Sequence, residues 1–366
     1  MTEQQFIPQP YSKTVSEGRV SWESPSNIAL VKYWGKKKNQ IPENPSISFT
    51  LSKCKTITTV TFNKKVSAGD FDFEVFLDGE HKPDFQPKIE TFFNRVVEYL
   101  PFLKNYSFKI ETTNTFPHSS GIASSASGMS ALALCLMSIE KQLLSEEISE
   151  AFFYTKASFL ARLGSGSACR SLEGDLIVWG ANTTVQDGSD LFGVKYPFPV
   201  HEHFKGYQDT ILLVDKGEKQ VSSTVGHNLM YGHPFAAERF KQAHANLEAL
   251  KPVLESGDLD AFIALVESEA LTLHAMMMTS MPYFILMKPN TLEVINKIWA
   301  FRKTTGLHVG FTLDAGANVH VLYPKHEQEA VLDFIKSELA KYCQNDQFIC
   351  DEVGFGAQEL TECKLI

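Results

Sequence analysis

Paired cysteines are missing from this chain of 366 residues. Its six cysteines are scattered along the sequence, and no two of them form a Cys-x-x-Cys pair. This spacing excludes a zinc site built from cysteine pairs, and it excludes a disulfide framework. Scattered, reduced thiols are typical of proteins in the cytosol, where disulfides are rare.

A surplus of basic charge and a long apolar run are also missing. Lys and Arg number 34 against 43 Asp and Glu, which gives a net charge of −9 at pH 7. A general nucleic-acid binder is therefore disfavoured, although a local basic patch can still hold a phosphorylated small molecule. The longest strongly apolar stretch, Ala131 to Met137, is far shorter than a membrane span of roughly 20 residues. The first residues lack the apolar segment of a secretory signal, so we expect a soluble, cytoplasmic protein.

The pattern of apolar residues predicts an α+β protein with two lobes. At this length a single core stops growing, and the sequence shows no internal repeat. The first dozen residues are expected to form an extended tail. In the first half we predict strands at 56–62, 71–77, 106–112 and 173–179, and helices at 124–144 and 148–163. After a connection at 187–205 we predict a strand at 210–215, helices at 236–250, 259–277, 291–302 and 327–342, and a hairpin of 309–313 with 318–322.

A loop of small and hydroxyl residues, PHSSGIASSASG, runs from Pro117 to Gly128 directly into a predicted helix. Such a loop lets backbone N–H groups approach an anion, and the helix N-terminus adds a favourable dipole. Ser124 and Ser125 are placed to cap the helix and to offer hydroxyls to a phosphate or its Mg²⁺. An ordinary capped helix start fits the same residues. The loop is not a P-loop, because no Lys follows its glycines.

A second small-residue loop, GSGSACRS, spans Gly164 to Ser171. Its Arg170 offers a planar fork that suits a carboxylate or a phosphate. By itself the segment fits a helix end with a surface arginine better. A serine-hydrolase elbow is excluded, since Gly-x-Ser-x-Gly does not occur around Ser165 or Ser167.

Four lysines fall within seven residues in NIALVKYWGKKK, from Lys32 to Lys38, interleaved with Tyr33 and Trp34. In an acidic chain this cluster is a candidate site for a polyanion, and a solvated basic face is the alternative. Asp314 lies where a predicted strand ends in a glycine-containing turn. Catalytic carboxylates occupy such positions, and so do the carboxylates of simple Asx-turns.

Taken together and in order, six segments closely resemble the diphosphomevalonate decarboxylase family of the GHMP kinase superfamily: NIALVKYWGK, NPSISFTLS, FPHSSGIASSASG, GSGSACRS, KQVSSTVGH and FTLDAGAN. The resemblance runs from about Ser24 to about Leu322. It implies a GHMP kinase fold, with an N-terminal ribosomal-protein-S5-like lobe, a C-terminal ferredoxin-like lobe and an active-site cleft between them. On this plan residues 1–19 are an N-terminal extension, 20–195 the ATP-binding lobe and 196–366 the C-terminal lobe.

The resemblance also implies a reaction in the mevalonate pathway of isoprenoid biosynthesis. An ATP- and Mg²⁺-dependent carboxy-lyase would phosphorylate the 3-hydroxyl of (R)-5-diphosphomevalonate. Loss of phosphate and CO₂ would then give isopentenyl diphosphate. ATP is a co-substrate, no organic cofactor is implied, and members of the family are commonly homodimers.

The family's functional residues can be placed on matching positions of this chain. Asp314 matches the catalytic Asp that orients the 3-hydroxyl, Lys32 the lysine beside it, and Arg170 the arginine that grips the substrate carboxylate. The remaining matches fall into two groups. The diphosphate side has Tyr33, Lys36, Ser165, Ser167 and Ser222, together with Arg170. The ATP side has Ser119, Ser120, Gly121, Ala123, Ser124 and Ser125, of which Ser124 and Ser125 would contact Mg²⁺.

The chain departs from the family pattern in three places. It has PHSSG where the loop usually reads PTAAG, and Ala317 replaces the proline of DAGPN. Many relatives carry an arginine in the region of Phe71–Gly79, which has none here. The missing arginine keeps open a decarboxylase of the 5-monophosphate. A mevalonate-type kinase is a further alternative, against which Arg170 and Asp314 argue. A non-catalytic nucleotide-binding relative is another, against which Lys32, Asp314 and Ser124 argue.

Overall fold

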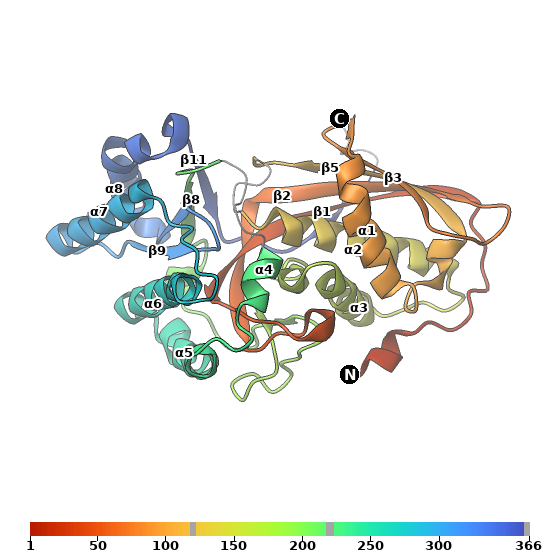
Figure 1. Cartoon of the computed structure of the whole chain (residues 1–366), viewed down its shortest axis with the longest axis horizontal. Helices are drawn as coiled ribbons and strands as arrows, with labels where there is room; N and C mark the ends of the chain where they lie inside the picture. The colour runs from red at the N-terminus through yellow and green to blue at the C-terminus, as the bar shows by residue number, and fades with distance from the viewer. Residues whose placement is uncertain (118–121, 217–222, 362–366) are drawn as a thin grey trace.

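The computed structural model describes residues 1–117, 122–216 and 223–361, and two β-sheets organise these parts of the chain (Figure 1). The first sheet has the order β12-β1-β2-β5-β3-β4, with β6 on β2 and β7 on β6. Its pairs are antiparallel except for β3 with β5. The strands are β1 (Glu17–Val31), β2 (Ser46–Lys64), β3 (Asp72–Leu77), β4 (Glu80–His81), β5 (Tyr106–Asn114), β6 (Leu176–Trp179), β7 (Val194–Lys195) and β12 (Gln358–Glu359).

Three helices cover one face of this sheet: α1 (Gln86–Val96), α2 (Ser124–Leu143) and α3 (Glu150–Gly164). Helix α2 packs against both β1 and β2, and α3 packs on α2. The alternation in TITTVTF predicts this arrangement, because it turns Val60 and Phe62 toward the helices, where both are wholly buried. The expected extended tail is wrong: Glu3–Phe6 forms a 3₁₀ helix, and Phe6 stacks on Phe159 with 4.4 Å between ring centroids.

The second sheet has the order β11-β8-β10-β9 and is antiparallel throughout. It consists of β8 (Gln208–Leu212), β9 (Gly310–Leu313), β10 (Val319–Tyr323) and β11 (Phe348–Glu352). The helices of this half are α4 (Ser223–Asn228), α5 (Ala236–Ser256), α6 (Leu259–Met278), α7 (Pro289–Thr305) and α8 (Gln328–Phe334). The predicted hairpin of β9 and β10 is confirmed, and so is the α+β class.

The last predicted helix does not continue to Tyr342. Helix α8 ends at Phe334, and a π-helical turn at Ile335–Leu339 and a 3₁₀ turn at Ala340–Tyr342 follow. Ile335 and Leu339 are wholly buried in the core of the second half. The apolar pattern therefore marks the buried face correctly, but it does not distinguish an α-helical turn from a wider or a tighter one.

The C-terminal segment returns to the first sheet, which the sequence pattern does not predict. Strand β12 pairs with β1, at Trp22 with Glu359 and at Glu23 with Gln358. At the end of β11 the Asp351 carboxylate accepts three backbone N–H groups of β2, from residues 52 to 54, at 2.7–3.0 Å. The two halves are thus joined by more than one crossing of the chain. The proposed lobe boundary at 195/196 stays a prediction.

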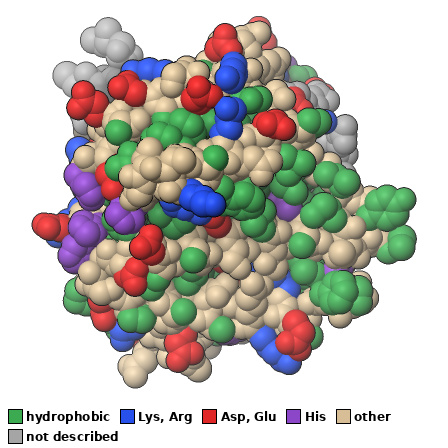
Figure 2. Space-filling model, turned by 90° about the vertical axis from the view of Figure 1, so that its left-hand side faces the viewer, with side chains coloured by type: hydrophobic (Ala, Val, Ile, Leu, Met, Phe, Trp, Pro, Cys, Tyr) green, Lys and Arg blue, Asp and Glu red, His purple; other side chains and the backbone are tan. Residues whose placement is uncertain are grey.

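Helix α6 is the one helix in the described parts that is long and apolar enough to cross a membrane. Its most apolar window is 56% buried inside the protein, and the helix packs against α5 and β9. The composition therefore reflects a core helix. Figure 2 shows the end of the molecule where α7 lies, and on this face basic side chains are scattered among acidic and apolar ones. That distribution agrees with the argument against a nucleic-acid surface.

Candidate active site

A cavity of about 620 Å³ lies where the two halves meet. It is lined by the end of β1 and the residues after it, the start of α2, the loop at 164–170 and the turn after β9, with further residues from β2, β5, α1, α4 and α6. The described site residues predicted from the sequence all line this cavity: Lys32, Tyr33, Lys36, Ala123, Ser124, Ser125, Ser165, Ser167, Arg170 and Asp314. The predicted residues Ser119, Ser120, Gly121 and Ser222 lie outside the described residues.

An ion pair joins the two halves at one end of the cavity. The Lys32 ammonium, at the end of β1, donates to Oδ1 of Asp314 at 2.8 Å. Lys32 is only 2% exposed, whereas the Asp314 side chain is 29% exposed and so reaches the cavity. The ring of His274 on α6 contacts the backbone carbonyl of Asp314 at 3.1 Å. A cation beside a carboxylate favours its ionised form, so the pair presents a fixed acceptor to a ligand.

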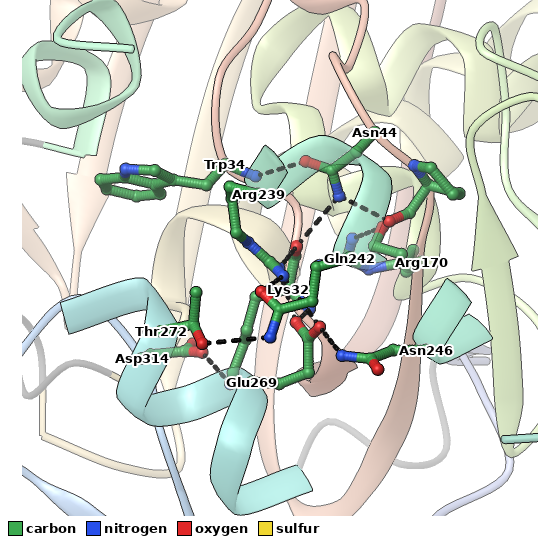
Figure 3. Close-up of polar contacts among 12 residues, drawn as sticks. Lys32, Trp34, Asn44, Arg170, Arg239, Gln242, Asn246, Glu269, Thr272 and Asp314 are labelled. Atoms are coloured by element: carbon green, nitrogen blue, oxygen red, sulfur yellow. Dashed lines mark hydrogen bonds and ion pairs between the residues drawn. The ribbon is translucent and has the colours of Figure 1, made fainter. Parts of the chain in front are cut away.

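The backbone of Lys32 is itself held by buried polar side chains from the second half (Figure 3). Glu269 accepts the Lys32 N–H at 2.8 Å, and Arg239 donates to the Lys32 carbonyl at 2.7 Å. Arg239 and Glu269 also pair with each other, with Nη1 2.9 Å from Oε1, and neither is appreciably exposed. Asn44 donates to the same carbonyl at 3.1 Å. Both backbone polar groups of Lys32, its N–H and its carbonyl, are therefore held by hydrogen bonds from buried side chains.

Arg170 is buried, so a surface arginine at a helix end is the wrong interpretation of its loop. It is 3% exposed, its guanidinium donates to Asn27 and Ser46, and it lies 5.7 Å from the centre of the Tyr33 ring. Gly166 permits this packing, because a Cβ there would lie 2.8 Å from the Tyr33 hydroxyl. Desolvation lowers the pKa of this buried guanidinium, and an anionic ligand beside it would offset part of the cost of burying its charge.

The start of α2 differs from the prediction. Its N-cap is Ala123, in the left-handed region at φ 45°, and no side chain caps the helix. Ser124 and Ser125 are already in the first turn, from which a hydroxyl cannot take the N-cap role. Both serines line the cavity instead. A helix start without a side-chain cap keeps N–H groups ready for an anion, so the phosphate interpretation gains support.

The lysine cluster divides in the structure. Lys32 and Lys36 line the cavity, and burial lowers the pKa of Lys36. Lys37 and Lys38 are exposed and do not line it. A different lysine takes part instead: Lys88 on α1, which is exposed but lines the cavity, donates to the Ser125 hydroxyl at 3.1 Å.

Sequence reasoning missed Lys88, Arg239 and Glu269. Glu269 and Arg239 each fall on the buried side of an amphipathic helix, a position where a charge is rare unless it is paired. That signal could have drawn attention to them. Lys88 carries no such signal, since it is one of many lysines in a polar helix turn.

Comparisons with known proteins identify the family of this chain. Residues 24–190 match the family model described as diphosphomevalonate decarboxylase-like N-terminal domain, and residues 210–362 match mevalonate 5-diphosphate decarboxylase C-terminal domain. The chain is 30% identical to diphosphomevalonate decarboxylase of Eremothecium gossypii over 333 residues, which cover 84% of this chain and 78% of the relative. The chain belongs to the diphosphomevalonate decarboxylase family.

Solved structures of this family share the fold. Mevalonate diphosphate decarboxylase from Staphylococcus aureus superposes with a TM-score of 0.80 at 27% identity, over 94% of this chain and 98% of that one. A structure of MDDEF in complex with MVAPP, AMPPCP and magnesium gives a TM-score of 0.79 at 28% identity, over 94% and 99%. The GHMP kinase fold expected from the sequence is thereby confirmed.

Proposed function

We propose that the protein catalyses the ATP-dependent decarboxylation of (R)-5-diphosphomevalonate to isopentenyl diphosphate, ADP, phosphate and CO₂. One observation carries the proposal: the Lys32–Asp314 pair and the buried Arg170 line the same cavity as the uncapped start of α2. A carboxylate acceptor, an anion clamp and a phosphate-binding helix start are what phosphorylation and decarboxylation of one substrate require.

Asp314 and Lys32 serve the phosphoryl transfer. A tertiary alcohol is a poor nucleophile, so the main contribution of Asp314 is to hold the 3-hydroxyl in line with the γ-phosphate of ATP. The hydroxyl proton passes toward the carboxylate as the new O–P bond forms and ADP leaves. Lys32 keeps the carboxylate ionised and offsets the charge of the transferring group.

Arg170 serves the decarboxylation. Its guanidinium binds the substrate carboxylate, whose C–C bond then breaks to release CO₂. The electron pair of that bond forms the double bond of the product as the C–O bond to the 3-phosphate breaks. Because Asn27 and Ser46 hold the Arg170 guanidinium in place before the substrate binds, little side-chain entropy is lost when it orients the carboxylate.

The two ligands would meet at Lys32, Arg170 and Asp314. The 5-diphosphate is assigned to Tyr33, Lys36, Ser165, Ser167 and Ser222, and ATP to the segment 119–125. Magnesium fits this arrangement, because the described residues hold no cluster of three or more metal-ligating side chains and Mg²⁺ takes most of its ligands from phosphates and water. When bound, it neutralises charge on the transferring phosphates. The Ser124 hydroxyl suits it better than Ser125, whose hydroxyl already meets the Lys88 ammonium.

The 5-monophosphate alternative rested on a missing arginine at 71–79. None of these residues lines the cavity, although Lys88 does. The absence of an arginine in β3 therefore gives no reason to prefer the substrate with fewer phosphates.

The proposal is tested by offering mevalonate, its 5-phosphate and its 5-diphosphate separately to the purified protein with ATP and Mg²⁺. ADP and CO₂ are measured together. We expect equal amounts of both products with the 5-diphosphate only. Turnover of the 5-phosphate instead, or ADP without CO₂, would replace the proposal with a monophosphate decarboxylase or with a simple kinase.

Two further expectations from the family belong to the proposal: a cytoplasmic location and a homodimer. Sedimentation of the purified chain tests the second. A single species of 41.0 kDa would contradict the dimer.

A further inference from the structure

His227, on the short helix α4, lines the cavity beside residues assigned to the diphosphate. Its ring stacks on Tyr33 with 4.4 Å between centroids and 26° between planes, and it lies 4.5 Å from the Trp34 ring. The residue is 5% exposed. Gly226, directly before it, allows this approach, because a Cβ there would lie 2.7 Å from the Trp34 ring. The imidazole is thus held in one place by two aromatic rings.

The hydrogen bond at the other side of the ring fixes its tautomer. Nδ1 accepts the backbone N–H of Gly35 at 3.0 Å, so in the neutral ring the proton lies on Nε2. Within residues 1–117, 122–216 and 223–361, no side chain or backbone group accepts a hydrogen bond from Nε2. His227 is 5% exposed and lines the cavity, so an Nε2–H without an acceptor among these residues marks a place for a ligand oxygen.

The surroundings keep this imidazole neutral. Burial, then the charge of Lys36, then that of Arg170 lower the pKa of His227 to about 3. Lys36 and Arg170 both line the same cavity as the ring. A neutral N–H donor among cations can bind a phosphate oxygen without adding a third positive charge that would have to be desolvated.

We propose that His227 donates a hydrogen bond from Nε2 to a phosphate oxygen at the 5-position of the substrate, and that it is a specificity-determining residue for the phosphorylated end. The inference rests on the proposed function for the identity of the substrate. It concerns a residue to which the family resemblance assigns no role, although His227 ends the motif KQVSSTVGH.

The test compares two variants by calorimetric titration. His227→Leu removes the donor and keeps a comparable volume, whereas His227→Gln keeps an N–H donor near the position of Nε2. Each is titrated with 5-diphosphomevalonate and with mevalonate, which has no phosphate. We expect His227→Leu to weaken binding of the 5-diphosphate roughly 10-fold or more, the size of one hydrogen bond to a charged group. Mevalonate binding should be unchanged, and His227→Gln should recover most of the lost affinity.

His244→Leu is the matched control, because His244 is exposed on α5 and does not line the cavity. Thermal unfolding of all three variants shows whether each is folded. Unchanged affinity of His227→Leu for the 5-diphosphate would overturn the inference. So would an equal loss for mevalonate, or a His227→Gln variant as weak as His227→Leu, since both would indicate a packing role.

Turnover by the wild-type protein separates this inference from the proposed function. If the wild type releases ADP and CO₂ from the 5-diphosphate and His227→Leu binds that substrate normally, only the inference fails. If the wild type does not turn over the 5-diphosphate, the proposed function fails, and titration with the 5-phosphate still measures whether His227 binds phosphate.

Discussion

The two ends of the cavity are built differently. The reaction end consists of Lys32, Arg170 and Asp314. Buried polar contacts of Lys32 cross between the two halves of the protein, and Arg170 is held by Asn27 and Ser46 within the first half. The loop end, which consists of Ala123, Ser124 and Ser125 with Lys88, has no side-chain cap on its helix, and one hydrogen bond links its lysine to its serine.

This difference follows from what each end has to do. Transition-state stabilisation needs charges that are in place before the reaction. The charges at the reaction end are therefore buried despite the free energy of desolvation, which their hydrogen bonds and ion pairs offset. A nucleotide that enters and leaves with each turnover needs donors that are open to water beforehand. Substitutions at the reaction end should therefore affect kcat strongly, and substitutions at the loop end should chiefly affect the KM for ATP.

The largest effect is expected for Asp314→Ala. Removal of the acceptor should lower kcat about 10³-fold or more, because in-line placement of the tertiary hydroxyl is lost. Binding of ATP and substrate, measured by titration, should persist. Near-normal turnover would refute the role assigned to Asp314.

Arg170→Gln should lower kcat/KM about 10²-fold, since a neutral amide cannot clamp a carboxylate as a guanidinium does. Steady-state kinetics with varied 5-diphosphomevalonate measure this loss. Arg170→Lys serves as the control that keeps the charge, and it should recover only part of the activity because it lacks the planar fork. An unchanged kcat/KM in Arg170→Gln would remove the clamp from the mechanism.

Glu269→Gln tests whether the contacts behind the reaction end matter. Arg239 would be left as a buried charge without its carboxylate, and the free energy of unfolding should fall by about 3 kcal/mol. The kcat should fall with it, while the KM for ATP should change less. Glu338→Gln, at the exposed pair with Lys297, is the matched control and should leave stability and kcat near wild type. Equal effects of the two substitutions would contradict the special position of Glu269.

The smallest effect is expected at the loop end. Lys88→Met should raise the KM for ATP roughly fivefold, the size of one partly solvated contact to phosphate, with kcat within about twofold of wild type. Lys82→Met, at an exposed lysine paired with Glu80, should leave both constants unchanged. A large fall in kcat for Lys88→Met would show that the loop end also takes part in the reaction.

The local sequence pattern was sufficient to predict most of the helices and strands and to find the residues of the motifs. The alternation at 56–62 specifies the buried face of that part of β2, and the turn at Asp314 follows from its glycine and the strands around it. Helix α2 was predicted from its apolar residues, although it is buried on nearly all sides. Strand β12 was missed because two residues leave no periodic signal, and its pairing with β1 is a contact across most of the chain. The predicted serine cap was wrong because the N-cap is Ala123, one residue before Ser124. Both serines therefore lie inside the first turn of the helix.

The sequence by itself determined which chemical groups this protein has: the small-residue loops, the lysine at the end of β1, Arg170 and the Asp after β9. Only the tertiary structure decided which of them work together. Lys32 and Asp314 are 282 positions apart, and their contact depends on the packing of two sheets. The same packing brought Lys32 and Lys36 to the cavity while Lys37 and Lys38 remained exposed, and it placed His227 between two aromatic rings. Long-range contacts of this kind depend on how buried surfaces pack against each other, and a local sequence pattern does not predict that packing.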